Sequence, residues 1–329
     1  MNFLVVGCGS IGKRHARNFT SLKQGDEKVY VYDQDQSLLQ DFSREIGAEI
    51  LTSIDDAGRA GIQGAVICVP NHMHVPLARK LMEQQIGILV EKPIAHDLAG
   101  LDELIALGRR NAVVLMTGYN LRYHRNLLKA KQMLDAGQIG SVKCARFFFG
   151  YNLSLWRPAI DYRKNYGAIK EQGGGVILDV IHEINCIIWL LGDVAEVSCM
   201  MGKLSSLEID TEDAAAIHLK MKTGAIVELH LDYIDMAYDR GFRIIGDSGT
   251  LVWDMPAMML KAYSPGTKSW TDMPDKFDFN ETYLGEARHF IASLRGSEKP
   301  YEDGGIGKRD LEIVLAAKES AASGRRIAI

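Results

Sequence analysis

A glycine-rich turn at residues 7–12 limits the possible folds of this 329-residue chain more than any other feature. It follows the short apolar run Phe3–Val6, which has the composition of a buried strand, and it opens a helical pattern over Lys13–Leu22. The first glycine permits a tight turn, the second lets the backbone approach a pyrophosphate, and the third lets the helix pack closely on the strand. N–H groups at the start of the helix then face the phosphates. The predicted phosphate-binding residues are Gly7, Gly9, Ser10, Ile11 and Gly12.

The second predicted strand supplies an acidic residue where a dinucleotide site needs one. Residues Lys28–Tyr32 have strand composition and end in Asp33, 21 residues after Gly12. A carboxylate at this position accepts hydrogen bonds from the hydroxyls of the adenosine ribose. Because the same charge repels a 2′-phosphate, the sequence favours NAD over NADP as the cofactor.

Strand and helix patterns alternate through the first third of the chain. Six predicted strands separated by helices indicate an α/β, doubly wound parallel sheet that closes near residue 118. From Val142 the hydrophobic period shifts towards two, and glycine-containing turns separate the later strands. The sequence therefore predicts a Rossmann domain over 1–118 and an α+β domain over 119–329, with a large, open, mostly antiparallel sheet. We expect a C-terminal helix to be able to pack back on the first domain.

The second sheet should have one covered and one open face, because residues 226–231 alternate along the strand. A large half-open sheet commonly finds a partner. We therefore expect a homodimer or homotetramer that forms through this sheet.

Two strands of the first domain end in residues that would face the ligand crevice. One buried strand ends just before Asn71, and the next ends just before Lys92. Ligands bind at the carboxyl edge of an open α/β sheet, so both ends should meet the cofactor. The sequence leaves open whether the bond from Lys92 to Pro93 is cis. The cofactor residues predicted at these ends are Val69, Pro70, Asn71, His74, Glu91 and Lys92.

A glycine triplet at 173–175 precedes the segment with the most informative polar pattern. Residues 176–191 are almost entirely apolar and predict one buried helix. At 100° per residue its few polar residues share one side, which should line a polar cavity. Asp179 and His182, at i and i+3, would be neighbours, so the carboxylate would make the imidazole a better proton acceptor. A satisfied core histidine is the alternative. The four polar residues are Asp179, His182, Glu183 and Asn185.

These elements, in this order, resemble the glucose-fructose oxidoreductase/inositol dehydrogenase/MocA family. The resemblance implies NAD(P)-dependent alcohol/ketone chemistry on a sugar or polyol. It also implies that Lys92 is the active-site lysine, that His182 transfers the proton, and that Asp179 supports His182. The matching segments are the glycine-rich turn, Val69-Pro70-Asn71 with His74, Glu91-Lys92-Pro93, residues 118–122, residues 173–192, and the closing stretch with Glu286, Phe290 and Ser320.

Two features depart from the family pattern. The spacing from Asp179 to His182 is one residue shorter than usual, which resembles a subgroup that acts on activated or nine-carbon sugars. Asn185 stands where an aspartate is commoner, and an amide offers substrate hydroxyls a donor as well as an acceptor. The predicted substrate contacts are Tyr119, Asn120, Arg122, Trp156, Arg157, Tyr162 and Asn185.

Composition argues against several other kinds of protein. The net charge of −4 disfavours nucleic acid or an anionic membrane as the main partner. The five cysteines show no C-x-x-C pair and predict free thiols in a reducing compartment, and no metal-ligand spacing is apparent. With no signal peptide pattern and no apolar run of membrane-spanning length, we expect a cytoplasmic protein.

The sequence thus predicts a dehydrogenase in which Lys92 and His182 act as a pair. His182 would take the hydroxyl proton while a hydride leaves for the nicotinamide, and Lys92 would stabilise the developing alkoxide. Two alternatives stay open at this point: a sensor that binds NAD and a sugar without turnover, and an NAD-assisted glycoside hydrolase. The retained Lys92, Asp179 and His182 argue against the sensor, and the lack of an export signal argues against the hydrolase.

Overall fold

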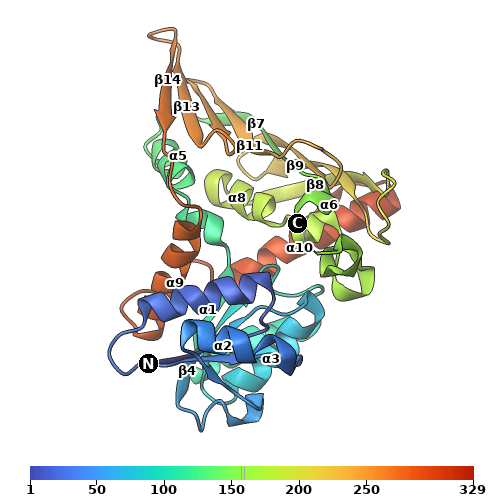
Figure 1. Ribbon diagram of the computed structural model, residues 1–329. Coiled ribbons are helices and arrows are strands. Elements are labelled where there is room, and N and C mark those ends of the chain that lie inside the picture. The colour runs from blue at the N-terminus through green and yellow to red at the C-terminus, as the bar shows by residue number, and fades with distance from the viewer. Residues whose placement is uncertain (157, 159) are drawn as a thin grey trace. The chain divides into compact units, whose positions relative to one another are not determined.

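The computed structural model describes residues 1–156, 158 and 160–329, which divide into two compact units (Figure 1). Residues 1–120 and 280–311 form the first unit, and residues 121–279 and 312–329 form the second. The sequence assigned 280–311 to the second domain. The chain returns to the first unit there because Phe290 packs in its core, with its ring edge-on to Phe19 at 6.3 Å.

The first unit is built on a six-stranded parallel sheet in the order β3-β2-β1-β4-β5-β6. The order reverses between β1 and β4, and this switch point is where ligands of doubly wound sheets bind. The prediction of a doubly wound parallel sheet is confirmed. The strands are β1 (Asn2–Val6), β2 (Val29–Tyr32), β3 (Glu49–Ile50), β4 (Ile62–Ile67), β5 (Gly87–Glu91) and β6 (Leu115–Gly118).

Helices pack on this sheet through apolar side chains. Phe19 of the first helix contacts Phe3 of β1, with the ring centroids 5.0 Å apart. The α-helices of the first unit are α1 (Ser10–Leu22), α2 (Gln40–Ile46), α3 (His74–Met82), α4 (Leu101–Asn111), α9 (Asn280–Leu294) and the first part of α10 (Gly304–Ser323). Short 3₁₀ turns are η1 (Gln36–Leu38), η2 (Ile54–Asp56), η3 (Asn71–Met73) and η4 (Asn120–Tyr123).

The second unit is built on a nine-stranded sheet in the order β14-β13-β12-β11-β7-β10-β9-β8-β15. All neighbours are antiparallel except β10 and β7, so the predicted open, mostly antiparallel sheet is confirmed. The sequence did not predict the two edge strands, because β14 is largely exposed and β15 has only two residues. The strands are β7 (Val142–Gly150), β8 (Val194–Gly202), β9 (Ala214–Met221), β10 (Ile226–Asp232), β11 (Asp239–Gly246), β12 (Thr250–Asp254), β13 (Met259–Ser264), β14 (Ser269–Pro274) and β15 (Ile327–Ala328).

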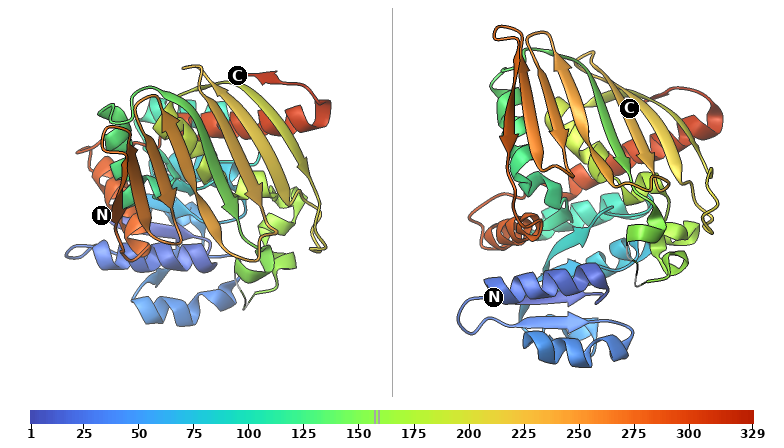
Figure 2. Two further views of the ribbon diagram at one scale, coloured as in Figure 1. Left: turned by 90° about the horizontal axis from the view of Figure 1, so that it is seen from above. Right: turned by 45° about the horizontal axis from the view of Figure 1, so that its top comes forward.

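One face of the nine-stranded sheet is covered by helices of its own unit, and Figure 2 shows the other face in its left view. On β10, Val227, Leu229 and Leu231 are buried, whereas Ile226 is 57% exposed. Met200 of β8 is 78% exposed. The helices of this unit are α5 (Arg125–Asp135), α6 (Leu153–Trp156), α7 (Val176–Asp179), α8 (His182–Leu191) and the end of α10, and its 3₁₀ turns are η5 (Tyr162–Lys164), η6 (Tyr166–Ala168) and η7 (Lys170–Gln172).

The prediction of one continuous helix over 176–191 is wrong. The chain tightens after α7, where the N–H of Ile181 bonds to the carbonyl of Leu178 three residues back, and α8 continues at an angle of 43° to the helical residues before the break. The side-chain angles projected from 100° per residue therefore do not apply across this bend. Within the described residues no single helix is long and apolar enough to cross a membrane. The two helical segments on either side of this bend meet those requirements of length and composition only when they are taken together.

Candidate functional site

The glycine-rich turn has the geometry that each glycine requires. Gly7 has φ of +91°, and a Cβ there would lie 2.6 Å from the carbonyl oxygen of Cys68. A Cβ on Gly12 would lie 1.8 Å from the carbonyl oxygen of Gly7, so α1 could not approach the turn with any side chain at that position. Gly9 faces open space, and no side chain caps the first amides of α1. These amides can therefore take a phosphate, as the sequence predicts.

Asp33 follows β2 and ties it to the turn. Its Oδ2 accepts a hydrogen bond from the Cys8 N–H at 2.6 Å, and its Oδ1 accepts one from the Asp35 N–H at 2.9 Å. A cavity of about 300 Å³ opens beside this carboxylate, within the size range of small-molecule sites. Its lining residues all come from the first unit: Val6, Gly7, Gly9, Tyr32, Asp33, Gln34, Leu38, Ile54, Cys68, Val69, Pro70, Met73 and Leu77.

The cavity brings together five of the predicted cofactor residues, namely Gly7, Gly9, Asp33, Val69 and Pro70. Ser10, Ile11 and Gly12 lie in the first turn of α1, and Asn71 begins η3 behind Pro70. The residues present fit a dinucleotide: open amides lie at the helix start, an acid stands beside the cavity, and apolar walls are available to an adenine ring.

His74 holds the ends of β4 and β5 together. Its Nε2 lies 2.8 Å from the carbonyl oxygen of Val69, and its Nδ1 lies 2.9 Å from that of Pro93. Burial lowers the pKa of His74, so a neutral ring donates to one carbonyl at a time. The bond between Lys92 and Pro93 is cis, and the Lys92 side chain is half-buried. His74 thus positions the loop that carries Lys92.

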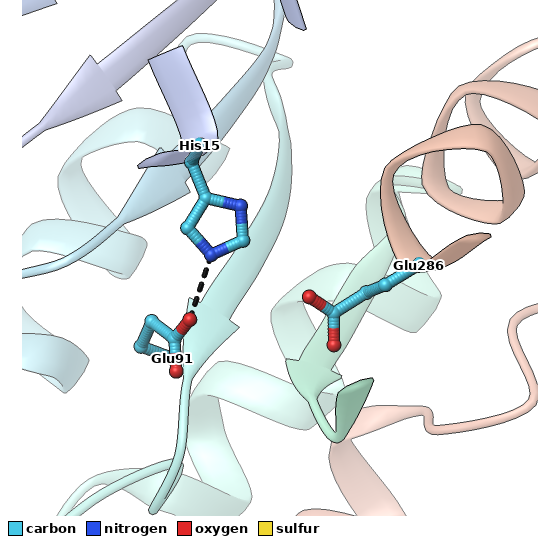
Figure 3. A group of neighbouring side chains, drawn as sticks. All are labelled: His15, Glu91 and Glu286. Atoms are coloured by element: carbon cyan, nitrogen blue, oxygen red, sulfur yellow. Dashed lines mark hydrogen bonds and ion pairs between the residues drawn. The ribbon is translucent and has the colours of Figure 1, made fainter. Parts of the chain in front are cut away.

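His15, Glu91 and Glu286 form a buried cluster in the first unit (Figure 3). His15 Nε2 lies 2.7 Å from Glu91 Oε1, and Glu286 points its carboxyl towards this pair from α9. Burial alone would raise the pKa of Glu91, but His15 and Lys92 hold it below its usual value. For Glu286, burial and the charges of Glu91 and Glu302 raise the pKa well above its usual value. Glu286 is therefore held as the neutral acid beside the hydrogen-bonded His15 and Glu91.

One ligand atom from each residue of this cluster lies within 4.8 Å of the others, a spacing open to a metal ion. A tetrahedral ion with ligands about 2.1 Å away would hold its ligand atoms roughly 3.4 Å apart. The 2.7 Å contact of His15 with Glu91 is shorter, which is the spacing of a direct hydrogen bond. Sequence reasoning missed this cluster, although a histidine three residues after Gly12 and an acid in the apolar stretch of α9 were visible signals.

In the second unit, Asp179 ends α7 and accepts hydrogen bonds from two tyrosines. The Tyr166 hydroxyl donates to Oδ1, and the Tyr233 hydroxyl donates to Oδ2 at 3.0 Å. Asp179 is buried, whereas His182, the first residue of α8, is half-buried. A bend lies between them, so angles projected along one straight helix do not give their geometry, and their pairing stays a prediction. Neither tyrosine stood out in the sequence, because no local pattern links them to position 179.

Glu183 and Arg240 form a buried ion pair beside His182. Arg240 Nε donates to Glu183 Oε1 at 2.6 Å, and the guanidinium lies over the Phe149 ring at 5.3 Å. The pair anchors the first turn of α8 to β11. Sequence reasoning identified Glu183 as polar in an apolar segment but not its partner, which lies 57 residues away.

The predicted substrate residues fall into separate groups. Arg122 and Asn185 come together, with Arg122 Nε donating to Asn185 Oδ1 at 3.0 Å, and the guanidinium lies over Trp189. Asn120 instead donates to the Thr282 hydroxyl at 2.8 Å within the first unit. The remaining side chains are placed as follows: Tyr119 is buried, Trp156 Nε1 donates to the carbonyl of Tyr151, the Tyr162 hydroxyl accepts from the Glu208 N–H, and Arg157 lies outside the described residues.

Comparison with known proteins identifies relatives along the whole chain. Residues 1–119 match the family described as "Oxidoreductase family, NAD-binding Rossmann fold", and residues 127–252 match the GFO/IDH/MocA C-terminal domain. Myo-inositol 2-dehydrogenase of Thermotoga maritima is 25% identical, over 99% of this chain and 98% of its own length.

Two solved structures share the fold. The levoglucosan dehydrogenase complex with NADH and levoglucosan has a TM-score of 0.89 at 18% identity, covering 100% of this chain and 99% of its own. UDP-N-acetylglucosamine 3-dehydrogenase of Acidithiobacillus ferrooxidans has a TM-score of 0.81 at 20% identity, covering 98% of each chain. Since two models of one family together match most of this chain, it belongs to the GFO/IDH/MocA family of NAD-binding oxidoreductases.

Proposed function

We propose that this enzyme interconverts a secondary alcohol and a ketone on a sugar, polyol or nucleotide-activated sugar. The observation that carries the proposal is the cavity beside Asp33 and the uncapped start of α1 at Gly9, at the switch point of the parallel sheet. This site suits NAD, because Asp33 offers a carboxylate to ribose hydroxyls and repels a 2′-phosphate. NAD, when bound, supplies the hydride acceptor for the oxidation.

Two residues carry the proposed roles in proton transfer and charge stabilisation. His182 accepts the proton of the reacting hydroxyl, since imidazole exchanges protons near neutral pH. Lys92, as an ammonium, stabilises the alkoxide that develops as the hydride leaves. Asp179, which accepts hydrogen bonds from Tyr166 and Tyr233, supports His182 in this role.

The substrate class follows from the relatives. Their names include an inositol, an anhydro sugar and a nucleotide-activated amino sugar, all of which carry secondary hydroxyls. We propose that Arg122 and Asn185, which bond to each other, contact the substrate together, and that Asn120, Trp156, Arg157 and Tyr162 contribute to its binding. The Arg122 guanidinium would suit a substrate with a phosphate or carboxylate group.

We also propose that a second copy of the chain covers the open face of the nine-stranded sheet, giving a homodimer or homotetramer. The exposed Met200 and Ile226 on that face support this assembly. The cysteines at positions 8, 68, 144, 186 and 199 are free thiols, which supports our proposal that the protein works in the reducing cytoplasm.

The test is NADH absorbance with a panel of myo-inositol, levoglucosan, UDP-N-acetylglucosamine and an acylneuraminate sugar. Lys92→Ala and His182→Ala should each lower kcat by about 10²-fold or more while NAD still binds. Lys23→Ala, an exposed lysine in the first unit, is the matched control and should behave as wild type. Full activity in both active-site variants would refute the proposed roles. NAD binding without reduction across the panel would favour a sensor, and sugar release from an aryl glycoside without net NADH would favour a hydrolase.

A further inference from the structure

We propose that Tyr166 is a further substrate-binding residue and that Asp179 positions it, so that the Tyr166 oxygen accepts a hydrogen bond from a hydroxyl or amide N–H of the sugar. The inference rests on the proposed function and adds a specificity element to it. Every contact that carries it lies within the second unit.

The two tyrosines that bond to Asp179 differ in exposure, although each donates one hydrogen bond to its carboxylate. Tyr233 is fully buried, and burial and Asp179 raise its pKa well above the usual value, so it stays a protonated donor. Tyr166 donates to the other carboxylate oxygen and is half-buried. Tyr233 therefore bonds to the carboxylate as a fully buried residue, while Tyr166 bonds to it as a residue that is only half-buried.

The direction of the Tyr166 hydrogen bond decides what this hydroxyl can recognise. A tyrosine hydroxyl has one proton to donate and lone pairs that accept. Because the proton is committed to Asp179, a third group can approach the oxygen only as a donor. Sugar hydroxyls and acetamido N–H groups are such donors, whereas an ether or ketone oxygen is not.

Gly167 and the glycine triplet before α7 allow the close packing that holds Tyr166 in this position. A Cβ on Gly174 would lie 2.4 Å from the carbonyl oxygen of Tyr166, and a Cβ on Gly167 would lie 2.9 Å from Asp179 Oδ2. The Gly175 N–H also bonds to the carbonyl of Gly167 at 3.0 Å. Side chains at these positions would push η6 away from Asp179, so the packing explains why glycines stand there.

The contact also lies among residues that the sequence assigns to the substrate. Asp179 ends α7 and His182 begins α8, so the Tyr166 hydroxyl reaches the bend that carries the proposed proton acceptor. Trp156 packs edge-on against the Tyr233 ring at 5.3 Å. A substrate donor at Tyr166 would therefore belong to the same sugar that His182 deprotonates.

The matched pair Tyr166→Phe and Tyr233→Phe tests the inference, because each variant removes one hydroxyl from the same carboxylate. Steady-state kinetics are measured with the panel sugar that the wild type turns over fastest and with its monodeoxy analogues. Tyr166→Phe should lower kcat/KM for the sugar about tenfold or more and leave KM for NAD unchanged. The wild-type penalty for removing one particular hydroxyl should disappear in this variant.

Tyr233→Phe should lose thermal stability but keep the wild-type discrimination among the deoxy sugars. Asp179→Ala, which leaves the Tyr166 hydroxyl without its acceptor, should lose that discrimination and carries the test if Tyr166→Phe does not fold. Equal kinetics of the two tyrosine variants, or an unchanged deoxy penalty in Tyr166→Phe, would overturn the inference while the dehydrogenase function stands. A wild type that reduces no NAD with any sugar would overturn both.

Discussion

Glu286→Gln should make the protein more stable at neutral and alkaline pH. Glu286 is 1% exposed, and among the described residues neither of its carboxyl oxygens has a hydrogen-bond partner. Burial and the charges of Glu91 and Glu302 raise its pKa, so the folded protein keeps this carboxyl protonated. Glutamine has the shape of the protonated acid and carries no proton to lose. Its amide can also donate towards Glu91.

The sign and size of the effect follow from proton linkage. In the unfolded chain Glu286 ionises near its ordinary pKa, whereas the folded chain still holds the proton. Stability of the wild type therefore falls as pH rises from the unfolded pKa to the folded one, by at most about 1.4 kcal/mol per pH unit. For a unit of this size that slope corresponds to roughly 3–6 °C in Tm per pH unit. The glutamine variant lacks this loss.

Thermal unfolding of the two proteins at several pH values between about 5 and 8 measures the difference. The Tm of Glu286→Gln minus that of wild type should grow steadily with pH. Glu83→Gln removes an exposed carboxylate from the same unit and should shift Tm by a constant, small amount. A Tm difference for Glu286→Gln that does not change with pH, or that shrinks as pH rises, would refute the assignment of a neutral Glu286.

Two other substitutions test the cofactor turn and the open sheet. Gly12→Ala should abolish NAD binding, measured by calorimetry, because its methyl group would lie 1.8 Å from the carbonyl oxygen of Gly7. Gly266→Ala, whose methyl group would make only an ordinary contact at 3.7 Å with the Ser264 hydroxyl oxygen, should retain it, and normal affinity in the Gly12 variant would contradict the packing argument. Ile226→Asp should convert the proposed oligomer to monomers in light scattering after size exclusion, since it replaces an exposed apolar side chain of β10 with a charge. An unchanged mass would argue against assembly through this face.

The first domain was predictable because its signals are local. A glycine at a positive φ, such as Gly7, is a property of one residue and its neighbours. The apolar runs of parallel strands and the helices between them likewise depend on short segments. The six-stranded sheet, the switch point and the position of Asp33 at the end of β2 could therefore be anticipated. The alternation along β10 similarly indicated a sheet with one open face.

Side-chain partners could not be predicted, because they depend on segments far apart in the chain. Glu286 meets Glu91 only when α9 packs in the core of the first unit, and Arg240 reaches Glu183 from β11. The bend after Asp179 arises where the Ile181 N–H bonds to a carbonyl three residues back instead of four. Neither Val180 nor Ile181 is a residue type that predicts such a break. Helical projection therefore could not give the side-chain angles across this bend.

The sequence by itself determined the two sheets, the cofactor turn and the family, since each rests on local backbone preferences and motif order. Only the tertiary structure decided what the ionisable groups do. It surrounds Asp179 with Tyr166 and Tyr233, and it buries Glu286 beside an existing negative charge. The physical reason is that burial and neighbouring charges set hydrogen-bond direction and protonation, and both come from packing across the fold.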